Sequence, residues 1–189
     1  MFSERLIIRP VRADDAGDLF RIYGDPATNT FNPTGPYPDA AFATARLSQW
    51  LDGWRLHGIG EMAIYECEKP LEIIGFGGIS VRPLEHEQTH NLGYRFATAA
   101  WGKGLATEFC QRMLDYAFDE RQLGRITAVV RPNHLASQRV LLKAGLALRG
   151  QVADVANAAP SLFYALSIDE WHRHRQGMIR HPNSGLIGF

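Results

Sequence analysis

The fold is decided by the stretch Asn91-Leu-Gly-Tyr-Arg-Phe-Ala-Thr-Ala-Ala-Trp-Gly-Lys-Gly-Leu-Ala-Thr-Glu108. Aromatic and apolar residues predict a strand over 90–96, and small residues with two glycines predict a loop over 97–104. Apolar residues then recur at steps of three and four along 105–118, which predicts an amphipathic helix with one buried face. The chain therefore passes here from a strand through a glycine loop into a helix.

The glycine loop has the features of an anion site. A loop that opens a helix presents free backbone N–H groups at the positive end of the helix dipole, where phosphate groups bind. Gly102 and Gly104 lack the Cβ atoms that would hinder a close approach, and Lys103 adds a positive charge. On the glycines alone, an ordinary loop whose glycines serve turn geometry is the simpler interpretation.

A longer pattern around the loop favours the anion site. Trp101-Gly-Lys-Gly-Leu-Ala106 resembles the acyl-CoA pyrophosphate loop of the GNAT acetyltransferase superfamily, which is written Gln/Arg-x-x-Gly-x-Gly/Ala. Gly104 and Ala106 match its last two fixed positions, while Trp101 stands where Gln or Arg is usual. With the Thr-Glu that follows, the run is similar to the Rim-type branch, which contains the ribosomal-protein N-terminal acetyltransferases. The resemblance covers about residues 4–171, and it implies acetyl-CoA as co-substrate and an amine as acceptor.

Composition narrows the functional class. The 189 residues suit one domain, 46% of them are hydrophobic, and the formal net charge is zero. A protein that binds nucleic acid or a membrane surface would carry a basic excess, so neither partner is expected. No apolar run reaches membrane-span length, and the charged N-terminus does not resemble a signal peptide. Cys67 and Cys110 fall in predicted core elements, which predicts buried thiols in a soluble, cytoplasmic protein.

The rest of the chain supplies the other elements of an α+β fold. Further strands are expected at 5–10, 61–67, 71–81, 125–130, 146–152 and 161–168, and further helices at 14–23, 39–57 and 133–144. With the resemblance, this order predicts a GNAT-like, partly antiparallel sheet that is split at the cofactor strand and has helices on both faces. We expect a single acyl-CoA N-acyltransferase domain over 1–171. Residues 172–189 are expected to be a polar C-terminal tail or a homodimer contact.

The glycines of Gly75-Phe-Gly-Gly78 receive a structural interpretation. They are not a dinucleotide-binding fingerprint, because the third glycine is missing at its spacing and Pro83 interrupts the chain before any helix. We expect instead a strand with a close neighbouring backbone, followed by a polar loop over 82–89.

Two groups of polar residues also receive plain structural interpretations. Asp14 and Asp15 are expected to cap the first helix, because acidic residues stabilise a helix N-terminus. His172 and His174 lack the carboxylate and cysteine neighbours of a structural metal site, so they are expected to be solvated. No metal is expected.

The resemblance implies the contacts to acetyl-CoA. Backbone N–H groups of the loop would bind the pyrophosphate, and an N–H of the split strand would polarise the thioester carbonyl. The branch's usual pantetheine-contacting asparagine corresponds to His134, with Asn133 displaced by one, and Asn133 is alternatively a simple N-cap. The expected cofactor contacts are Tyr94, Arg95, Phe96, Trp101, Gly102, Lys103, Gly104, Leu105, Ala106, Thr107, Asn133, His134 and Ser137.

Proton acceptance is where this sequence departs from the family pattern. Asn91 stands where many relatives carry a glutamate, and asparagine can only orient a water. An α-amine with a pKa near 8 costs roughly 3 kcal/mol less to deprotonate at pH 7 than a lysine side chain with a pKa near 10.4. A site without a strong base therefore favours an α-amine or another amine of low pKa. Glu61, Glu85, Glu87 and Tyr164 remain as proton relays or as plain structural residues.

Protonation of the leaving thiolate departs from the pattern as well. The position of the family's usual acid tyrosine falls at Leu141. In the Rim-type branch a serine one turn earlier contacts the CoA sulfur, and that position is Ser137. A serine in the first turn of a helix also has a structural interpretation, since it can satisfy backbone groups there. Phe31 and Tyr37 are the candidate acceptor contacts, because their loop helps to wall the acceptor site in this family.

These observations leave two functions for the acyl-CoA site, besides a third in which the chain is a structural homo-oligomer subunit that uses its C-terminal tail. The first is an acetyl-CoA-dependent N-acetyltransferase that acts on a protein N-terminal α-amine or a small-molecule amine, with Ser137, Asn91 and Tyr164 as catalytic candidates. The second is a non-catalytic acyl-CoA-binding or regulatory module of the same fold, which would explain the missing glutamate and tyrosine.

Overall fold

The computed structural model describes residues 1–84 and 87–179. The strands are β1 (Leu6–Pro10), β2 (Glu61–Glu66), β3 (Ile73–Leu84), β4 (Glu87–Phe96), β5 (Arg125–Val130), β6 (Ala147–Val152) and β7 (Ser161–Ser167). The helices are α1 (Ala16–Tyr23), α2 (Ala40–His57), α3 (Leu105–Asp115), α4 (Leu135–Ala144) and α5 (Ile168–Ile179). Short 3-10 turns lie at Ala13–Asp15, Pro26–Asn29 and Thr98–Ala100, and a π-helical turn lies at Tyr116–Glu120.

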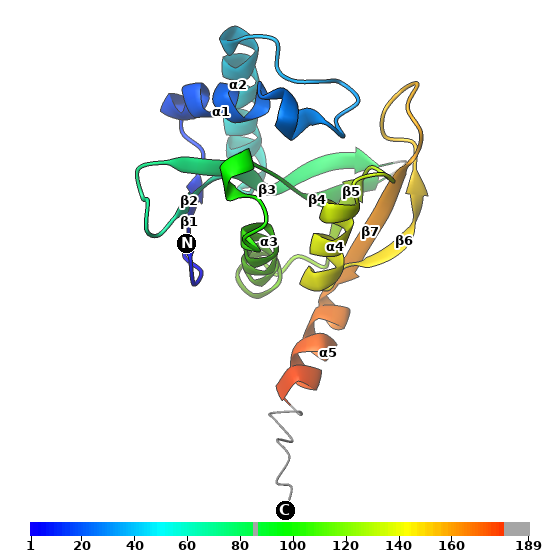
Figure 1. Cartoon of the computed structure of the whole chain (residues 1–189). Coiled ribbons are helices and arrows are strands. Elements are labelled where there is room, and N and C mark those ends of the chain that lie inside the picture. Colours follow the sequence, from blue (N-terminus) through cyan, green and yellow to red (C-terminus); the bar gives the residue numbers. More distant parts are fainter. Residues whose placement is uncertain (85–86, 180–189) are drawn as a thin grey trace, which may run out of the picture.

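The seven strands form one sheet in the order β1-β2-β3-β4-β5-β7-β6. The pairing of β4 with β5 is parallel, and the other neighbours are antiparallel. Helices α1 and α2 cover one face of the sheet, and α3 and α4 lie on the other face (Figure 1). The predicted α+β class, the partly antiparallel sheet and the helices on both faces are confirmed.

The sheet opens between β4 and β5. β4 stays in register with β3 along its whole length, from Glu87 opposite Leu84 to Phe96 opposite Gly75. β4 and β5 share a single register pair, Asn91 with Thr127. Because the two strands diverge beyond that pair, the predicted split of the sheet is confirmed.

Two apolar cores hold the layers together. The larger lies between the sheet and α3 with α4, and it contains the fully buried side chains of Phe109, Met113 and Phe118. The smaller lies between the sheet and α1 with α2, around Leu47 and Phe76. Full burial of one such side chain stabilises the fold by about 1.5–3 kcal/mol. The predicted buried face of the central helix is confirmed, except that Ala106 is only partly buried.

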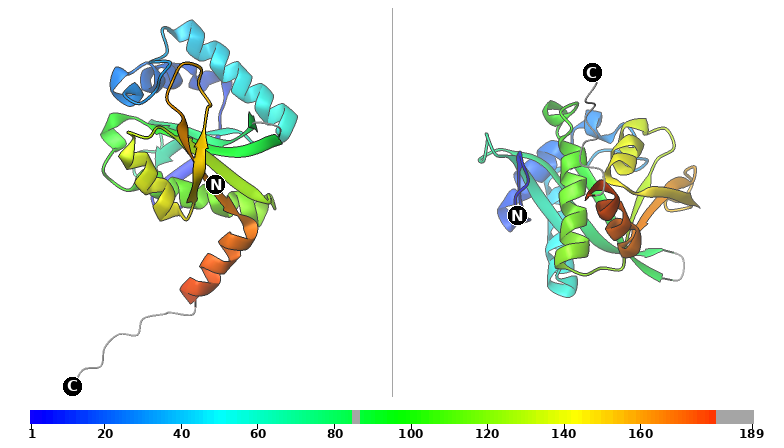
Figure 2. Two further views of the ribbon diagram at one scale, coloured as in Figure 1. Left: turned by 90° about the vertical axis from the view of Figure 1, so that its right-hand side faces the viewer. Right: turned by 90° about the horizontal axis from the view of Figure 1, so that it is seen from below.

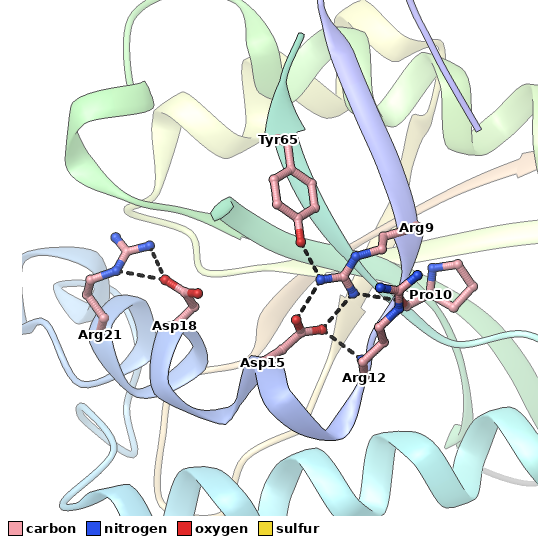
Figure 3. A network of polar contacts seen from close by, with 7 residues as sticks. All are labelled: Arg9, Pro10, Arg12, Asp15, Asp18, Arg21 and Tyr65. Atoms are coloured by element: carbon pink, nitrogen blue, oxygen red, sulfur yellow. Dashed lines mark hydrogen bonds and ion pairs between the residues drawn. The ribbon is translucent and has the colours of Figure 1, made fainter. Parts of the chain in front are cut away.

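An ion pair ties β1 to the turn that precedes α1. Asp15 is buried, and its carboxylate accepts hydrogen bonds from the two terminal nitrogens of Arg9 at 2.8 and 2.6 Å and from the N–H of Arg12 at 2.7 Å (Figure 3). Arg9 also donates to the hydroxyl of Tyr65 in β2. The carboxylate of Asp15 raises the pKa of the Arg9 guanidinium. Asp15 therefore caps the 3-10 turn before α1 through the N–H of Arg12, makes no side-chain cap at the start of α1 itself, and also binds Arg9 of β1.

The glycines of β3 allow a close backbone approach, as predicted. A Cβ atom on Gly78 would lie 2.2 Å from the carbonyl oxygen of Gly60, and one on Gly77 would lie 2.7 Å from that of Gly93. Neither distance is compatible with a side chain, so the strands can meet in this way only with glycine at both positions.

Two predictions about β2 and β3 are wrong. The loop expected over 82–89 is shorter, because β3 continues through Pro83 to Leu84 and β4 begins at Glu87. Proline is tolerated there because β2 pairs with β3 only as far as Gly78, so the missing N–H faces no strand on that side. Cys67 is exposed rather than buried, since it follows the end of β2, whereas Cys110 is buried as predicted.

The predicted tail begins as a helix. α5 continues to Ile179 and extends away from the sheet (Figures 1 and 2). Glu170 accepts hydrogen bonds from the N–H and hydroxyl of Ser167 at 2.9 and 3.1 Å, and Trp171 packs against Phe118. Arg175 pairs with Asp119 at 2.5 Å. These contacts attach the first turns of α5 to the domain, and residues 180–189 lie outside the described part of the chain.

Candidate active site

The loop before α3 carries a row of available N–H groups. Gly102 and Gly104 adopt φ values of +75° and +78°, a conformation that favours glycine. Within residues 1–84 and 87–179, the N–H groups of residues 102–106 have no hydrogen-bond acceptor. By contrast, the N–H of Trp101 bonds to Thr98, and that of Thr107 bonds to Gly104, both at 3.1 Å. The N–H groups of 102–106 are therefore free to bind a ligand at the N-terminus of α3, a position that suits an anion.

Two cationic side chains flank this loop. Lys103, predicted from the sequence, lies 3.4 Å from the carboxylate of Glu66. Arg5, which sequence reasoning missed, donates from Nη1 to the carbonyl oxygen of Lys103 at 2.9 Å and pairs through Nε with Glu108 at 2.7 Å. Its Nη2 lies 3.6 Å from the position of a Cβ on Gly104. No local pattern could have identified Arg5, because it reaches the loop only through the pairing of β1 with the sheet.

A backbone N–H of β4 points into the opening between β4 and β5. The hydroxyl of Thr127 in β5 donates to the carbonyl oxygen of His90, so the peptide groups of His90 face β5. Alternate residues of a strand present their peptide groups to the same neighbour. The N–H groups of Tyr94 and Phe96 therefore face the opening, whereas that of Arg95 faces β3. Of the three strand residues predicted to contact the cofactor, Tyr94 and Phe96 can donate their N–H groups to a ligand in the opening, and Arg95 cannot.

The side chain of Tyr94 reaches α4 on the face of the sheet that α3 and α4 cover. Its hydroxyl oxygen lies 2.9 Å from that of Ser137. Burial raises the pKa of Tyr94, so its hydroxyl remains protonated at neutral pH. Leu141, one turn later on α4, is buried in the core and takes no part in this contact.

The N-terminus of α4 differs from the prediction in one respect. His134 occupies the N-cap position, so the interpretation of Asn133 as the N-cap is wrong; Asn133 is exposed one residue earlier. The ring of His134 stacks on Phe31 with centroids 4.1 Å apart, and its Nδ1 is buried without a hydrogen-bond partner. Burial and the charge of Arg95 lower the pKa of His134, which favours the neutral ring. An unpartnered neutral imidazole is suited to a hydrogen bond with a polar ligand.

A cavity of about 530 Å³ lies beside the opening, on the face covered by α1 and α2. Its floor includes Asn91 and Thr127, the single pair that joins β4 to β5. The remaining lining residues are Arg82, Pro83, Leu84, Thr89, Val129, Val152, Ala153, Asp154, Val155 and Phe163. The loop between β6 and β7, which supplies Asp154, rises on the same side of the sheet as α1 and α2 (Figures 1 and 2).

A smaller hollow of about 400 Å³ lies between the predicted acceptor loop and the segment that precedes α4. It is lined by Phe31 with its loop neighbours and by Asn133 with Arg131 and Pro132. Tyr37, the other predicted acceptor contact, lines neither hollow. It packs against Tyr23 and Phe42 with centroids 5.1 and 4.8 Å away, within the smaller core.

The predicted proton-transfer residues lie in different environments. Asn91 is buried in the floor of the larger cavity. Tyr164 is buried in the larger core, and burial raises its pKa. Glu87 is exposed and pairs with Arg125. Glu61 is buried at the start of β2, where burial raises its pKa to about 7, and Glu85 lies outside the described residues.

Within residues 1–84 and 87–179, no group of three or more histidine, cysteine, aspartate or glutamate side chains is arranged to hold a metal ion. No helix in the same ranges has both the length and the apolar character needed to cross a membrane.

Known proteins share this sequence pattern and fold. Residues 5–147 match the family of the acetyltransferase (GNAT) domain. Over 158 residues the chain is 27% identical to an uncharacterized N-acetyltransferase, p20, of Bacillus licheniformis, which covers 84% of this chain and 88% of that protein.

Two solved structures are similar in fold. A ribosomal-protein-S5-alanine acetyltransferase from Vibrio fischeri aligns with a TM-score of 0.72 and 18% identity over 90% of this chain and 97% of that chain. The aminoglycoside acetyltransferase AAC(6')-Ib, in complex with paromomycin and acetyl-CoA, aligns with a TM-score of 0.75 and 16% identity over 91% of this chain and 98% of that chain. At these identities the likeness extends to the fold alone.

Proposed function

The chain belongs to the acetyltransferase (GNAT) family, and we propose that it transfers the acetyl group of acetyl-CoA to a primary amine. The observation that carries this proposal is the opening between β4 and β5. The N–H groups of Tyr94 and Phe96 face this opening, and β4 continues directly into the loop before α3, whose N–H groups are free to bind an anion. A thioester whose pyrophosphate is bound at the loop can extend along this opening.

The residues on both sides of the opening fit acetyl-CoA. The N–H groups of 102–106 would bind the pyrophosphate, with Lys103 and Arg5 supplying positive charge. The neutral, unpartnered Nδ1 of His134 would bond to an amide of the pantetheine arm. The N–H groups of Trp101 and Thr107 are engaged within the loop, so the predicted contacts of these two residues with acetyl-CoA would come from their side chains. AAC(6')-Ib, which has the same fold, binds acetyl-CoA.

The chemical roles of the chain's own residues follow from this pose. Acetyl-CoA supplies the acetyl group as a thioester, and the amine nitrogen bonds to the acetyl carbon as the carbon–sulfur bond breaks. The N–H of Tyr94 would donate to the carbonyl oxygen as negative charge develops there, an interaction that typically contributes about 3 kcal/mol. Ser137, held by the hydroxyl of Tyr94, would donate to the departing sulfur.

The larger cavity is the proposed acceptor site. The described part of its lining is mostly apolar, and the single carboxylate among these described residues, Asp154, lies 3.6 Å from a nitrogen of Arg131. Arg82 adds a further positive charge. The described lining residues offer a polycationic acceptor such as an aminoglycoside one carboxylate, which already has a cationic neighbour. The cavity favours an acceptor with one amine beside an apolar group, and the α-amine of a protein chain with a small or apolar first residue fits this description.

This acceptor choice agrees with the Rim-type sequence pattern around Trp101. The ribosomal-protein-S5-alanine acetyltransferase, whose name describes an alanine acceptor, has the same fold. Because an α-amine is partly neutral at pH 7, it also needs less proton abstraction than a lysine side chain.

Calorimetry and a thiol-release assay test the proposed function. Acetyl-CoA should bind, and CoA should be released fastest with a peptide that begins with a free alanine. The same peptide with a blocked N-terminus and one free lysine is the matched control, and an aminoglycoside is the polycationic comparison. Binding without turnover on any acceptor would instead support the non-catalytic module, and absence of binding would overturn both functions.

A further inference from the structure

Glu61 lies on the face of the sheet from which the acceptor would approach. Its register partner in β3 is Gly78, and the partner of Gly78 in β4 is Gly93. Register partners point to the same face of a sheet, as do residues two apart on a strand. Glu61 therefore shares its face with Asn91, and with Arg95 farther along β4. Tyr94 lies on the opposite face.

The surface over Gly93 is open on this face. A Cβ atom built on Gly93 would have one neighbour within 4 Å, Nδ2 of Asn91 at 3.8 Å. Gly78, by contrast, is covered by the backbone of Gly60 and Glu61. The start of β2 therefore leans over the adjacent strand toward the open space. Gly93 immediately precedes Tyr94, so this space borders the position proposed for the thioester carbonyl.

The carboxylate of Glu61 is available for chemistry. The side chain is buried, with 8% of the residue exposed, and no described residue donates a hydrogen bond to its carboxylate oxygens. Of the described cations, Arg82 of β3 is the one whose charge lowers the pKa of Glu61. The Nε of Arg82 donates a hydrogen bond to the hydroxyl of Ser80 at 3.1 Å. Glu61 differs in this respect from Glu87, which is exposed and neutralised by Arg125.

Other titratable groups also surround Glu61. Tyr23 of α1 and Tyr37 of the following loop both have pKa values raised by burial and, to a lesser extent, by the charge of Glu61. Arg95 of β4 packs over the ring of Tyr23 at 4.3 Å and donates to the side-chain oxygen of Asn29. These partners hold Arg95 away from a direct ion pair, so Glu61 keeps its capacity to accept a proton.

We propose that the carboxylate of Glu61 accepts the proton that the acceptor amine loses during acetyl transfer. This role rests on the proposed function. As the nitrogen–carbon bond forms and the carbon–sulfur bond breaks, the amine proton passes to Glu61, and the sulfur leaves with the bonding electron pair. Asn91 contributes its amide to the same space and orients the amine. Glu61 thus supplies the base that position 91 lacks in this sequence.

The ionisation of Glu61 suits this role. Burial raises its pKa to about 7, and the charge of Arg82 acts in the opposite direction. A carboxylate with such a pKa is about half ionised at neutral pH, where a general base is most effective.

The test compares rate against pH for the wild type and for Glu61→Gln, with two amines whose pKa values are about 8 and about 10.4. For the wild type, the curve of rate against pH should show one inflection near pH 7 with both amines. A second inflection should follow the pKa of whichever amine is used. Glu61→Gln should lose the shared inflection and lower kcat/KM by about 100- to 10,000-fold. Its affinity for acetyl-CoA, measured by calorimetry, should be unchanged. Glu87→Gln is the matched control and should behave as the wild type.

Three outcomes would overturn the role of Glu61. A folded Glu61→Gln variant with wild-type rates and pH profile would do so directly. Equal losses in Glu61→Gln and Glu87→Gln would show a general effect of charge. A wild-type protein that binds acetyl-CoA but acetylates no amine would remove the proposed function itself, and the role of Glu61 with it.

Discussion

The hydroxyl oxygens of Tyr94 and Ser137 lie 2.9 Å apart, so one hydrogen bond joins β4 to α4, the helix that follows the strand on the other side of the opening. Two hydroxyls in such a pair share one proton between them and keep the second free. A phenol is the stronger acid, so Tyr94 is the better donor within the pair. The proton of Ser137 is then free for a third atom, which the proposed function identifies as the CoA sulfur.

Ser137→Ala should lower kcat by about 10- to 1,000-fold, with little change in acetyl-CoA affinity or melting temperature. The loss arises because the departing sulfur loses its hydrogen-bond donor. If Tyr94 acts through Ser137, Tyr94→Phe should cause a similar loss, and the double variant should be no slower than the slower single variant. Steady-state kinetics and calorimetry on the three variants measure this.

The competing interpretation of Ser137 is structural. In that case the alanine variant should lose about 1 kcal/mol of unfolding free energy with the hydrogen bond and keep wild-type turnover. Additive losses in the double variant would show that the two hydroxyls act separately.

The loop before α3 gives a second prediction, in which two variants of Gly104 separate the effect of a side chain's charge from the effect of its size. Aspartate and asparagine have the same size, and both tolerate the φ of +78° at Gly104 better than other side chains do. Gly104→Asp should weaken acetyl-CoA binding by about 100-fold relative to Gly104→Asn, because a carboxylate about 5 Å from a phosphate costs roughly 3 kcal/mol at an effective dielectric of 20. If calorimetry gave equal affinities for the two folded variants, the pyrophosphate would have to bind at another place in the protein.

The sequence was sufficient for those parts of the fold that rest on local signals. The glycine loop and the spacing of apolar residues predicted α3 and its buried face, and the helix predicted over 39–57 ends at the same residue as α2. The continuation of β3 through Pro83 was not predictable, because it depends on where β2 stops pairing. Cys67 was predicted to be buried because the strand was expected to end at 67, but β2 ends one residue earlier and leaves Cys67 exposed.

The candidate site depends more on contacts between distant residues. Tyr94 and Ser137 are 43 positions apart, and Arg5 reaches Glu108 across 103 positions. No periodicity links such pairs. The resemblance supplied Ser137 through its motif position, whereas the hydroxyl of Tyr94 and the guanidinium of Arg5 became visible only from the packing of the elements. The roles of all these residues stay predictions until the variants are measured.

The ion pair of Figure 3 gives a prediction about stability. Asp15→Ala should lower the free energy of unfolding by about 3–5 kcal/mol, because it leaves the partly buried guanidinium of Arg9 without its carboxylate partner. Asp14→Ala is the matched control, since Asp14 is exposed and adjacent, and it should change stability by less than about 0.5 kcal/mol. Urea unfolding measures both. Similar small losses in the two variants would mean that the pair contributes little to the fold.

The raised pKa of Glu61 gives the last prediction, which concerns stability rather than rate. Between the ordinary value of 4.5 and the folded value of about 7, the folded protein binds a proton that the unfolded chain has lost. The contribution of Glu61 to stability is therefore fully present below about pH 4.5 and falls as the pH rises through 7. The total loss is about 3 kcal/mol, since one pKa unit corresponds to about 1.4 kcal/mol.

Glutamine does not titrate, so Glu61→Gln should become more stable relative to the wild type by about 2.5 kcal/mol between about pH 5 and about pH 8. Urea unfolding at several pH values measures the difference. Glu87→Gln, which removes an exposed carboxylate, is the matched control. A stability difference for Glu61→Gln that does not vary with pH would mean that Glu61 ionises as a solvated carboxylate does. It would then be mostly ionised well below neutral pH, and the shared kinetic inflection near pH 7 would need another group.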